Sequence, residues 1–195
     1  MAAQTADPIQ EFLEIFERAK EREVADATRV ALATVDSSAH PTVRVVLLKQ
    51  VDERGFVFYT NFDSRKAQHL DENPNAALCF YWPSIDEQIR VEGVVERVSD
   101  EEADAYFATR DRGSKVGAWA SRQSRPLDSR RTLIGRYLKY QAKFAARQVP
   151  RPDFWGGYRL RPERIEFWHN QAHRLHDRFL YVREDDGWKV ERLYP

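Results

Sequence analysis

Residues 28–60, TRVALATVDSSAHPTVRVVLLKQVDERGFVFYT, contain three apolar stretches with the two-residue period of β-strands. Larger side chains alternate with smaller ones from Val30 to Val35, residues 43–48 are almost all β-branched or leucine, and residues 56–60 form the third stretch. Residues 52–55 (DERG) separate the last two stretches and place a glycine where a hairpin turn needs a left-handed backbone. Three strands joined by short turns predict an antiparallel sheet.

The rest of the chain alternates between further strands and helices. Strands are expected at residues 76–82, 88–98, 165–169, 178–184 and 188–193. Helices are expected after an N-cap at Asp7 with Pro8 and Gln10 behind it, at residues 65–72 after Ser64, after the capping box that begins at Ser99, and at residues 116–120 and 130–147. Gly156 and Gly157 are expected in a loop, and Gly93 is expected to mark a bulge or a close backbone approach.

Hairpin-linked strands with helices as inserts are typical of a mainly β (α+β) protein rather than of a β-α-β fold. Six or more antiparallel strands with few spare edges predict a six-stranded antiparallel barrel with flanking helices. The length suits a single domain over residues 1–195. In this domain residues 1–25 form an N-terminal helical segment, and residues 160–195 supply the closing strands.

Composition narrows the class of protein. The 31 Lys and Arg side chains balance 31 Asp and Glu side chains, which argues against a general nucleic-acid or membrane binder. Cys79 is the single cysteine, so the sequence contains no disulfide framework and no thiolate cluster for a metal. The N-terminus lacks the pattern of a signal peptide, and no run approaches the roughly 18 apolar residues of a membrane span. We therefore expect a cytoplasmic globular protein.

Residues 167–181, FWHNQAHRLHDRFLY, combine five large apolar side chains with three histidines and two arginines. A mixture of apolar scaffold and a few polar groups is typical of a pocket wall. His169, His173 and His176 lie close in sequence, but no acidic residue is spaced to complete a metal site. Hydrogen-bonding histidines are therefore favoured over metal ligands, and no metal is predicted.

Cationic side chains stand at predicted strand ends, helix starts and loops beside apolar residues. They are Arg44, Lys49, Arg65, Lys66, Arg110, Arg122, Arg174 and Arg178. Arginine can bind phosphate through two parallel hydrogen bonds, lysine adds a point charge, and the helix start after Ser64 also favours an anion. Each residue taken singly is better explained as a surface charge, but together they favour a phosphate pocket on a barrel.

Several segments, in one order along the chain, resemble the pyridoxine (pyridoxamine) 5′-phosphate oxidase family. They are residues 44–49 (RVVLLK), 58–61 (FYTN), 64–66 (SRK), 117–119 (GAW), 123–124 (QS), 154–157 (FWGG), 165–168 (IEFW), 174–179 (RLHDRF) and 192–195 (RLYP). The resemblance runs from about Ala27 to the last residue. It implies a split β-barrel homodimer with FMN between the subunits. The implied reaction oxidises pyridoxine or pyridoxamine 5′-phosphate to pyridoxal 5′-phosphate, with dioxygen reduced to hydrogen peroxide and ammonia released from the amine.

Position by position, the resemblance assigns three groups of residues. FMN would be held by Arg44, Val45, Val46, Leu47, Leu48, Lys49, Tyr59, Thr60, Arg65, Lys66, Gln88, Gln123, Ser124, Trp168 and Arg178. The substrate would be bound by Lys49, Tyr106, Arg110, Ser114, Arg174, Leu175 and His176. Of these, Arg174 and His176 would be the catalytic residues, lying over the substrate ring beside the flavin.

Three points stay open. Arg44 and Lys49 are five apart on one predicted strand and would point to opposite faces, so either a bulge or two contributing subunits are required. The segment before Ala6 lacks the basic, tyrosine-containing arm that often covers the substrate in this family, so a lid has to come from elsewhere. Related split barrels include phenazine-pathway flavin oxidases, although residues 174–178 (RLHDR) favour the vitamin B6 enzyme.

A different class of function is indicated by residues 121–140. Basic and aromatic side chains interleave there, as they do on surfaces that bind single-stranded nucleic acid. The neutral total charge favours the alternative, an amphipathic helix with one solvated face.

Overall fold

The computed structural model describes residues 7–195. Its strands are β1 (Arg29–Val35), β2 (Pro41–Asp52), β3 (Gly55–Asn61), β4 (Asn75–Trp82), β5 (Glu87–Arg97), β6 (Trp155–His169), β7 (Asp177–Glu184) and β8 (Gly187–Leu193). Its helices are α1 (Pro8–Arg22), α2 (Arg65–Glu72), α3 (Asp100–Thr109), α4 (Arg112–Ala120), α5 (Arg130–Lys143) and the short 3₁₀ helix η1 (Ala172–Arg174).

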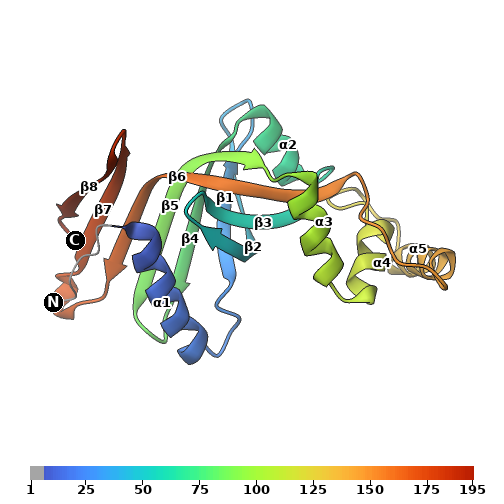
Figure 1. Ribbon diagram of the computed structural model, residues 1–195, viewed down its shortest axis with the longest axis horizontal. Coiled ribbons are helices and arrows are strands. Elements are labelled where there is room, and N and C mark those ends of the chain that lie inside the picture. Colours follow the sequence, from blue (N-terminus) through green and yellow to red (C-terminus); the bar gives the residue numbers. More distant parts are fainter. Residues whose placement is uncertain (1–6) are drawn as a thin grey trace.

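Six of the strands close into a barrel. The sheet order is β3-β2-β1-β4-β5-β6-β7-β8, and every pairing is antiparallel. An additional pairing between β3, at the edge of this order, and β6 closes the six strands from β3 to β6 into the barrel. Strands β7 and β8 extend the sheet beyond β6, so that the β7–β8 hairpin and helices α4 and α5 lie at opposite ends of the molecule (Figure 1). The predicted six-stranded antiparallel barrel with flanking helices is confirmed.

The barrel is split where β2 and β3 diverge. These strands pair only from Leu48 opposite Phe58 to Asp52 opposite Gly55, and the register shifts at Lys49. Beyond this point, residues 41–47 pair with β1 alone and residues 59–61 pair with β6 alone. The extra residue at Lys49 is a β-bulge, which changes the alternation of side chains along β2. Of the two arrangements expected for Arg44 and Lys49, the bulge is therefore present in the strand.

Helix α1 closes one end of the barrel because its apolar face carries aromatic rings. The fully buried ring of Phe12 lies 4.8 Å from the ring of Phe56 and 5.0 Å from that of Phe80. The predicted helix start is confirmed, since the Asp7 carboxylate accepts the N–H of Ile9 at 2.9 Å. Gln10, expected in a capping box, donates to Glu14 instead.

The expectation of a loop at Gly156 and Gly157 is wrong, because both glycines lie inside β6. This strand begins at Trp155, ten residues before the predicted start, and pairs Gly157 with Tyr59. A Cβ atom on Gly156 would lie 2.5 Å from the ring of Phe62, and one on Gly157 would lie 2.8 Å from the ring of Tyr59. The glycines therefore admit aromatic rings to the face of the strand, a role that local sequence does not separate from a turn.

Two other predicted features differ in detail. Helix α5 ends at Lys143 rather than at the predicted Arg147. In the segment that follows the helix, Arg112 donates hydrogen bonds to the carbonyl oxygens of Phe144 and Arg147. Ser64 precedes α2, but its side chain makes no cap hydrogen bond and accepts one from Lys66. The capping box of α3 and the bulge at residue 93 are confirmed.

The residues before position 7 lie outside the described part of the chain. The expectation that no basic arm precedes Ala6 concerns only these residues, and the expectation of no signal peptide concerns them in part. Among residues 7–195, no helix is both long enough and apolar enough to cross a membrane.

Candidate functional site

A cleft of about 920 Å³ occupies the opening between the diverging strands β2 and β3. This volume is near the upper end for small-molecule sites, which run from about 300 to 1,000 Å³. Predicted site residues that line the cleft are Arg44, Val45, Val46, Leu47, Lys49, Tyr59, Thr60, Arg65, Lys66, Tyr106, Arg110, Ser114, Gln123 and Ser124. Leu48 does not line it, because its side chain points into the barrel core.

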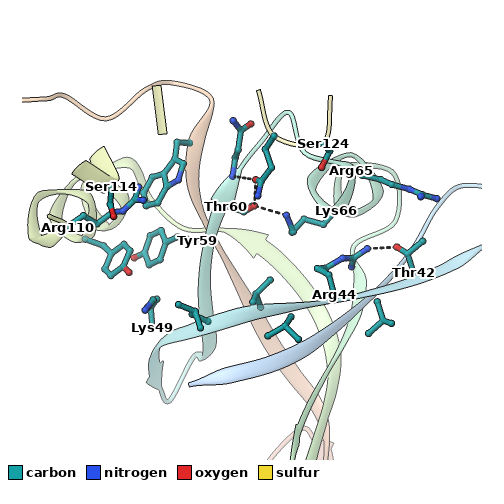
Figure 2. A pocket seen from close by; sticks show the side chains of 18 of the residues that line it. Thr42, Arg44, Lys49, Tyr59, Thr60, Arg65, Lys66, Arg110, Ser114 and Ser124 are labelled. Carbon is teal, nitrogen blue, oxygen red and sulfur yellow. Dashed lines mark hydrogen bonds between the residues drawn. The ribbon is translucent and has the colours of Figure 1, made fainter. Parts of the chain in front are cut away.

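One end of the cleft holds three cations, Arg44 from β2 and Arg65 and Lys66 from the start of α2 (Figure 2). Lys66 is only 8% exposed, and its Nζ donates to Thr60 Oγ1 at 3.1 Å. Burial, with a smaller contribution from the charge of Arg44, lowers the pKa of Lys66 to about 8. Within residues 7–195 no ion pair joins any of these three cations to a carboxylate. A buried positive charge of this kind favours a bound anion.

The other end of the cleft holds Lys49, Arg110 and Ser114 (Figure 2). The Arg110 guanidinium lies 4.6 Å from the ring centre of Trp155, and burial lowers its pKa. Its Nη1 is the single buried side-chain nitrogen or oxygen in residues 7–195 that lacks a hydrogen-bond partner. Such groups are rare in proteins, because an unpaired buried donor loses the hydrogen bonds it makes in water. The second end therefore also fits an anion.

An aromatic wall supports this second end. Tyr59 stacks on Tyr106 with ring centres 4.0 Å apart and an angle of 16° between the rings. Trp155 lies beside this pair, with its ring centre 5.4 Å from that of Tyr59 and 6.2 Å from that of Tyr106, and it is nearly parallel to both rings. Tyr106 lies in the last turn of α3 and Arg110 is the C-cap residue of the same helix, so the end of α3 brings the Arg110 guanidinium to the aromatic wall. The stack fixes a flat apolar surface beside the two cationic ends of the cleft.

The loop between α4 and α5 contributes Gln123 and Ser124. Gln123 Oε1 accepts a hydrogen bond from Thr60 at 3.3 Å and from the backbone N–H of Asn61 at 3.4 Å. Ser124 has a positive φ of 67°, which is uncommon for a residue with a side chain. Strained backbone of this sort concentrates at binding sites.

The remaining predicted site residues do not reach the cleft. Gln88, Trp168 and Arg178 lie opposite one another on β5, β6 and β7, and Arg174 and His176 lie on the turn before β7. With Leu175, these residues form a second group at the end of the molecule that carries the β7–β8 hairpin (Figure 1). A single chain therefore does not bring all the assigned residues to one cleft, and the resemblance had implied a site between two subunits. Six of the assigned residues stand apart from the cleft because they lie near the end of β6 that pairs with β7, whereas the cleft lies near the start of β6, which pairs with β3.

The turn of the second group has a strained backbone. His173 and Arg174 are consecutive non-glycine residues in the left-handed region, with φ of 58° and 61°. The His176 ring packs 4.5 Å from that of Trp168, and its Nδ1 accepts the backbone N–H of Gln171 at 3.2 Å. The exposed Arg174 side chain has no hydrogen bond or ion pair within residues 7–195. The turn therefore presents the unpaired cation of Arg174 and the hydrogen-bonded imidazole of His176 to a bound molecule or a second subunit.

An apolar surface connects the two groups on the outside of the barrel. We call it the outer apolar face; it consists of Ala31, Ala33, Val43, Val45, Leu47, Ala77, Cys79 and Tyr81. Val43 and Val45 are 69% and 65% exposed, yet both also line the cleft. At its far edge, Tyr81 lies opposite Gln88 of the second group. Contiguous exposed apolar surface of this kind marks a site of association.

Sequence reasoning did not assign several residues that line the cleft. They are Thr42, Val43, Asn61, Thr109, Asp111 and Trp155. Thr42 could have been found, because it lies two residues before Arg44 on the same strand and therefore on the same side. Trp155 lies next to the two glycines that were expected in a loop, so its place on a strand was hidden by that error.

Two protein-family models match the chain. One, described as pyridoxamine 5′-phosphate oxidase, matches residues 16–144. The other, described as the pyridoxine 5′-phosphate oxidase C-terminal dimerisation region, matches residues 155–195. The first therefore includes every residue that lines the cleft except Trp155, and the second includes Trp155 and the turn with Arg174 and His176.

Curated relatives and solved structures show the same likeness. A protein named pyridoxine/pyridoxamine 5′-phosphate oxidase from Myxococcus xanthus (strain DK1622) is 57% identical, over 97% of this chain and 92% of its own. One of the same name from Rubrobacter xylanophilus is 53% identical, over 97% of this chain and 87% of its own. PhzG from Burkholderia lata 383, solved in complex with tetrahydrophenazine-1-carboxylic acid, superimposes with a TM-score of 0.93 at 31% identity, covering 98% of this chain and 94% of its own. A Nostoc punctiforme FMN-binding protein, at 20% identity and a TM-score of 0.74 over 93% and 96% of the chains, shares the fold.

Proposed function

Because the chain belongs to the pyridoxamine 5′-phosphate oxidase family of oxidoreductases, we propose that it makes pyridoxal 5′-phosphate with FMN as cofactor. Pyridoxine 5′-phosphate and dioxygen would give pyridoxal 5′-phosphate and hydrogen peroxide. Pyridoxamine 5′-phosphate would consume one water in addition and release ammonia. The observation that carries this proposal is the pair of cationic ends in one cleft, since both FMN and the substrate carry a phosphate.

FMN is proposed to bind with its phosphate at the end formed by Arg44, Arg65 and Lys66. These three cations have no carboxylate partner among the described residues, and the first N–H groups of α2 add to their field. The exposed β2 side chains Val45 and Leu47 would contact the apolar flavin ring. When bound, FMN supplies the redox chemistry by accepting a hydride equivalent from the substrate and passing the electrons to dioxygen.

The substrate phosphate is proposed to bind at Lys49, Arg110 and Ser114. The buried Nη1 of Arg110 supplies a donor that no protein group uses. The aromatic wall with Tyr106 and Tyr59 gives this end an apolar side, and an apolar surrounding strengthens a charge-assisted hydrogen bond. Substrates without a phosphate would leave these cations unpaired and are expected to bind poorly.

Arg174 and His176 are proposed to act on the substrate ring from a second subunit. Since Nδ1 of His176 accepts an N–H, its neutral ring carries a proton on Nε2 and can donate to the substrate. The unpaired charge of Arg174 would stabilise the substrate oxygen or nitrogen as it loses its proton. Both side chains would thereby orient the donor carbon against the flavin.

A homodimer through the outer apolar face would bring the two groups together. That face runs from the cleft to the strand that carries Gln88, so a twofold axis across it would set one subunit's turn over the other's cleft. The match of residues 155–195 to a dimerisation region supports a homodimer, and those residues include the turn with Arg174 and His176. FMN would then lie between the subunits, with Gln88, Trp168 and Arg178 contributed by the partner.

The test is pyridoxal 5′-phosphate formation from pyridoxine 5′-phosphate in air, with FMN added to the purified protein. Product with an equal amount of peroxide is expected. His176→Ala and Arg174→Ala should lower turnover far more than FMN content. Bound FMN without product would move the reaction to another substrate, and neither product nor FMN binding would overturn the proposal.

A phenazine-type oxidase is the second candidate, because PhzG aligns over almost the whole chain. Its bound ligand is a carboxylic acid and carries no phosphate. The unpaired Arg110 Nη1 and its neighbour Lys49 favour a phosphate ester. Faster oxidation of a dihydrophenazine carboxylic acid than of pyridoxine 5′-phosphate would favour this candidate instead.

A further inference from the structure

His69 lies on α2 behind the cationic end of the cleft and does not line the cleft itself. We propose that His69 is a positioning residue, which holds the guanidinium groups of Arg44 and Arg65 in the orientation that receives the flavin phosphate. This inference rests on the proposed FMN site and extends it to a residue behind the cleft wall.

His69 is 5% exposed, and its ring is linked to Arg65 directly and to Arg44 through two threonine hydroxyl groups. On one side, Arg65 Nε donates to His69 Nε2 at 3.4 Å. On the other side, His69 Nδ1 lies 3.3 Å from Thr34 Oγ1 and 3.5 Å from Thr42 Oγ1. Both hydroxyl oxygens accept hydrogen bonds from Arg44, with 2.7 Å from Nη1 to Thr34 Oγ1. The ring therefore links Arg65 to Arg44.

The partners of the ring decide where its proton lies. Arg65 Nε carries a hydrogen and can only donate, so His69 Nε2 must accept. The proton of the neutral ring is then on Nδ1, where it points at the hydroxyl groups of Thr34 and Thr42. The resulting chain runs from Arg65 through His69 and the threonines, and every member has a partner.

This chain of hydrogen bonds offsets the repulsion between the positive charges of Arg44, Arg65 and Lys66. Burial, and to a smaller extent the charge of Arg65, lowers the pKa of Arg44, and the charge of Arg44 in turn helps to lower that of Lys66. Three neighbouring cations without a carboxylate would turn toward water if their side chains were free. A neutral, buried His69 holds Arg65 without adding a fourth charge or neutralising the group, so the field stays available for a dianion.

This role predicts an effect on the phosphate part of the ligand alone. FMN and riboflavin share the flavin ring and the ribityl chain, but riboflavin has no phosphate. Loss of the His69 contacts should weaken FMN binding and leave riboflavin binding unchanged. Preorganised side chains raise affinity because the cost of ordering them is met before the ligand binds.

The experiment measures dissociation constants of FMN and riboflavin for the apoprotein by quenching of flavin fluorescence. His69→Leu removes both ring nitrogens, His69→Gln keeps one amide that can replace Nε2, and Gln68→Leu changes the exposed neighbour on the same helix as a matched control. We expect His69→Leu to weaken FMN binding by about ten- to a hundredfold, with riboflavin changed less than about twofold. His69→Gln should recover part of the loss, and Gln68→Leu should have no effect.

Each outcome decides between named alternatives. Equal weakening of FMN and riboflavin would mean that His69 only supports the fold, and unchanged FMN binding in His69→Leu would also overturn the proposal. If His69→Leu does not fold, as judged by circular dichroism, the ratio of the two dissociation constants in His69→Gln decides. Failure of the unaltered protein to bind FMN would instead overturn the proposed function, so the two failures are distinguishable.

Discussion

A site built from two subunits predicts that two inactive variants become active when they share a dimer. Arg110→Met damages the cleft, and Arg174→Met damages the turn before β7. In a hybrid dimer, one site combines both lesions, and the other combines an intact cleft with an intact turn. Each variant by itself has the same lesion in both of its sites.

The size of the effect can be worked out in two steps. Arg110 offers two donors to a phosphate, and each hydrogen bond to a charged group contributes about 1.5–3 kcal/mol, so its loss lowers kcat/KM by about 10²- to 10⁴-fold. We expect a comparable loss for Arg174→Met, so that either homodimer has about 1% of normal activity or less. Random exchange of equal amounts gives about one half hybrids with one intact site in two, so activity should recover to about a quarter of normal.

The assay unfolds and refolds the two variants together with FMN and follows pyridoxal 5′-phosphate formation. Two different affinity tags isolate the hybrid, whose activity should be about half that of the unaltered dimer. The matched control mixes Arg110→Met with Lys66→Met, since both lesions lie in the cleft and no intact site can form. An isolated hybrid of Arg110→Met and Arg174→Met without recovered activity would refute the shared site.

Three further predictions concern protonation and packing. Lys66 has a pKa of about 8 and must be charged to attract a phosphate, so the dissociation constant of FMN should rise by at most tenfold per pH unit between pH 8 and about 9.5. Lys66→Arg should remove this pH dependence, because arginine stays charged over the whole range. The hydrogen bond to Glu87 raises the pKa of His169, so the stability that this hydrogen bond contributes is complete below a pH of about 6.5 and is lost as pH rises through the raised value. The difference in the free energy of unfolding in urea between the protein and His169→Asn should therefore shrink over that range, and a difference that stays constant would contradict the prediction. Gly93→Ala would place Cβ 2.0 Å from the carbonyl oxygen of residue 161 and should destabilise the protein by at least about 2 kcal/mol in chemical denaturation, whereas Gly135→Ala, with open space in α5, should stabilise it by about 1 kcal/mol.

The strand pattern and several local signals could be predicted from the sequence. The alternation over residues 28–60, the turn at Gly55 and the capping box at Ser99 depend on neighbours within a few positions. Such signals are local because backbone geometry and capping hydrogen bonds involve residues close in the chain. The motifs around Arg44 and Lys66, and the assignment of Arg110 by resemblance, likewise identified cations that line the cleft.

Tertiary structure alone decided where these elements meet. The bulge at Lys49 and the divergence of β2 from β3 open the cleft, and both depend on pairing between strands rather than on the residues of one strand. Gly156 resembles a turn residue until the ring of Phe62 is known to lie against it. The division of the site has the same origin, because sequence motifs carry no distances. Strand β6 pairs with β3 at its start and with β7 at its end, and this places the cleft and the turn with Arg174 at opposite ends of one long strand.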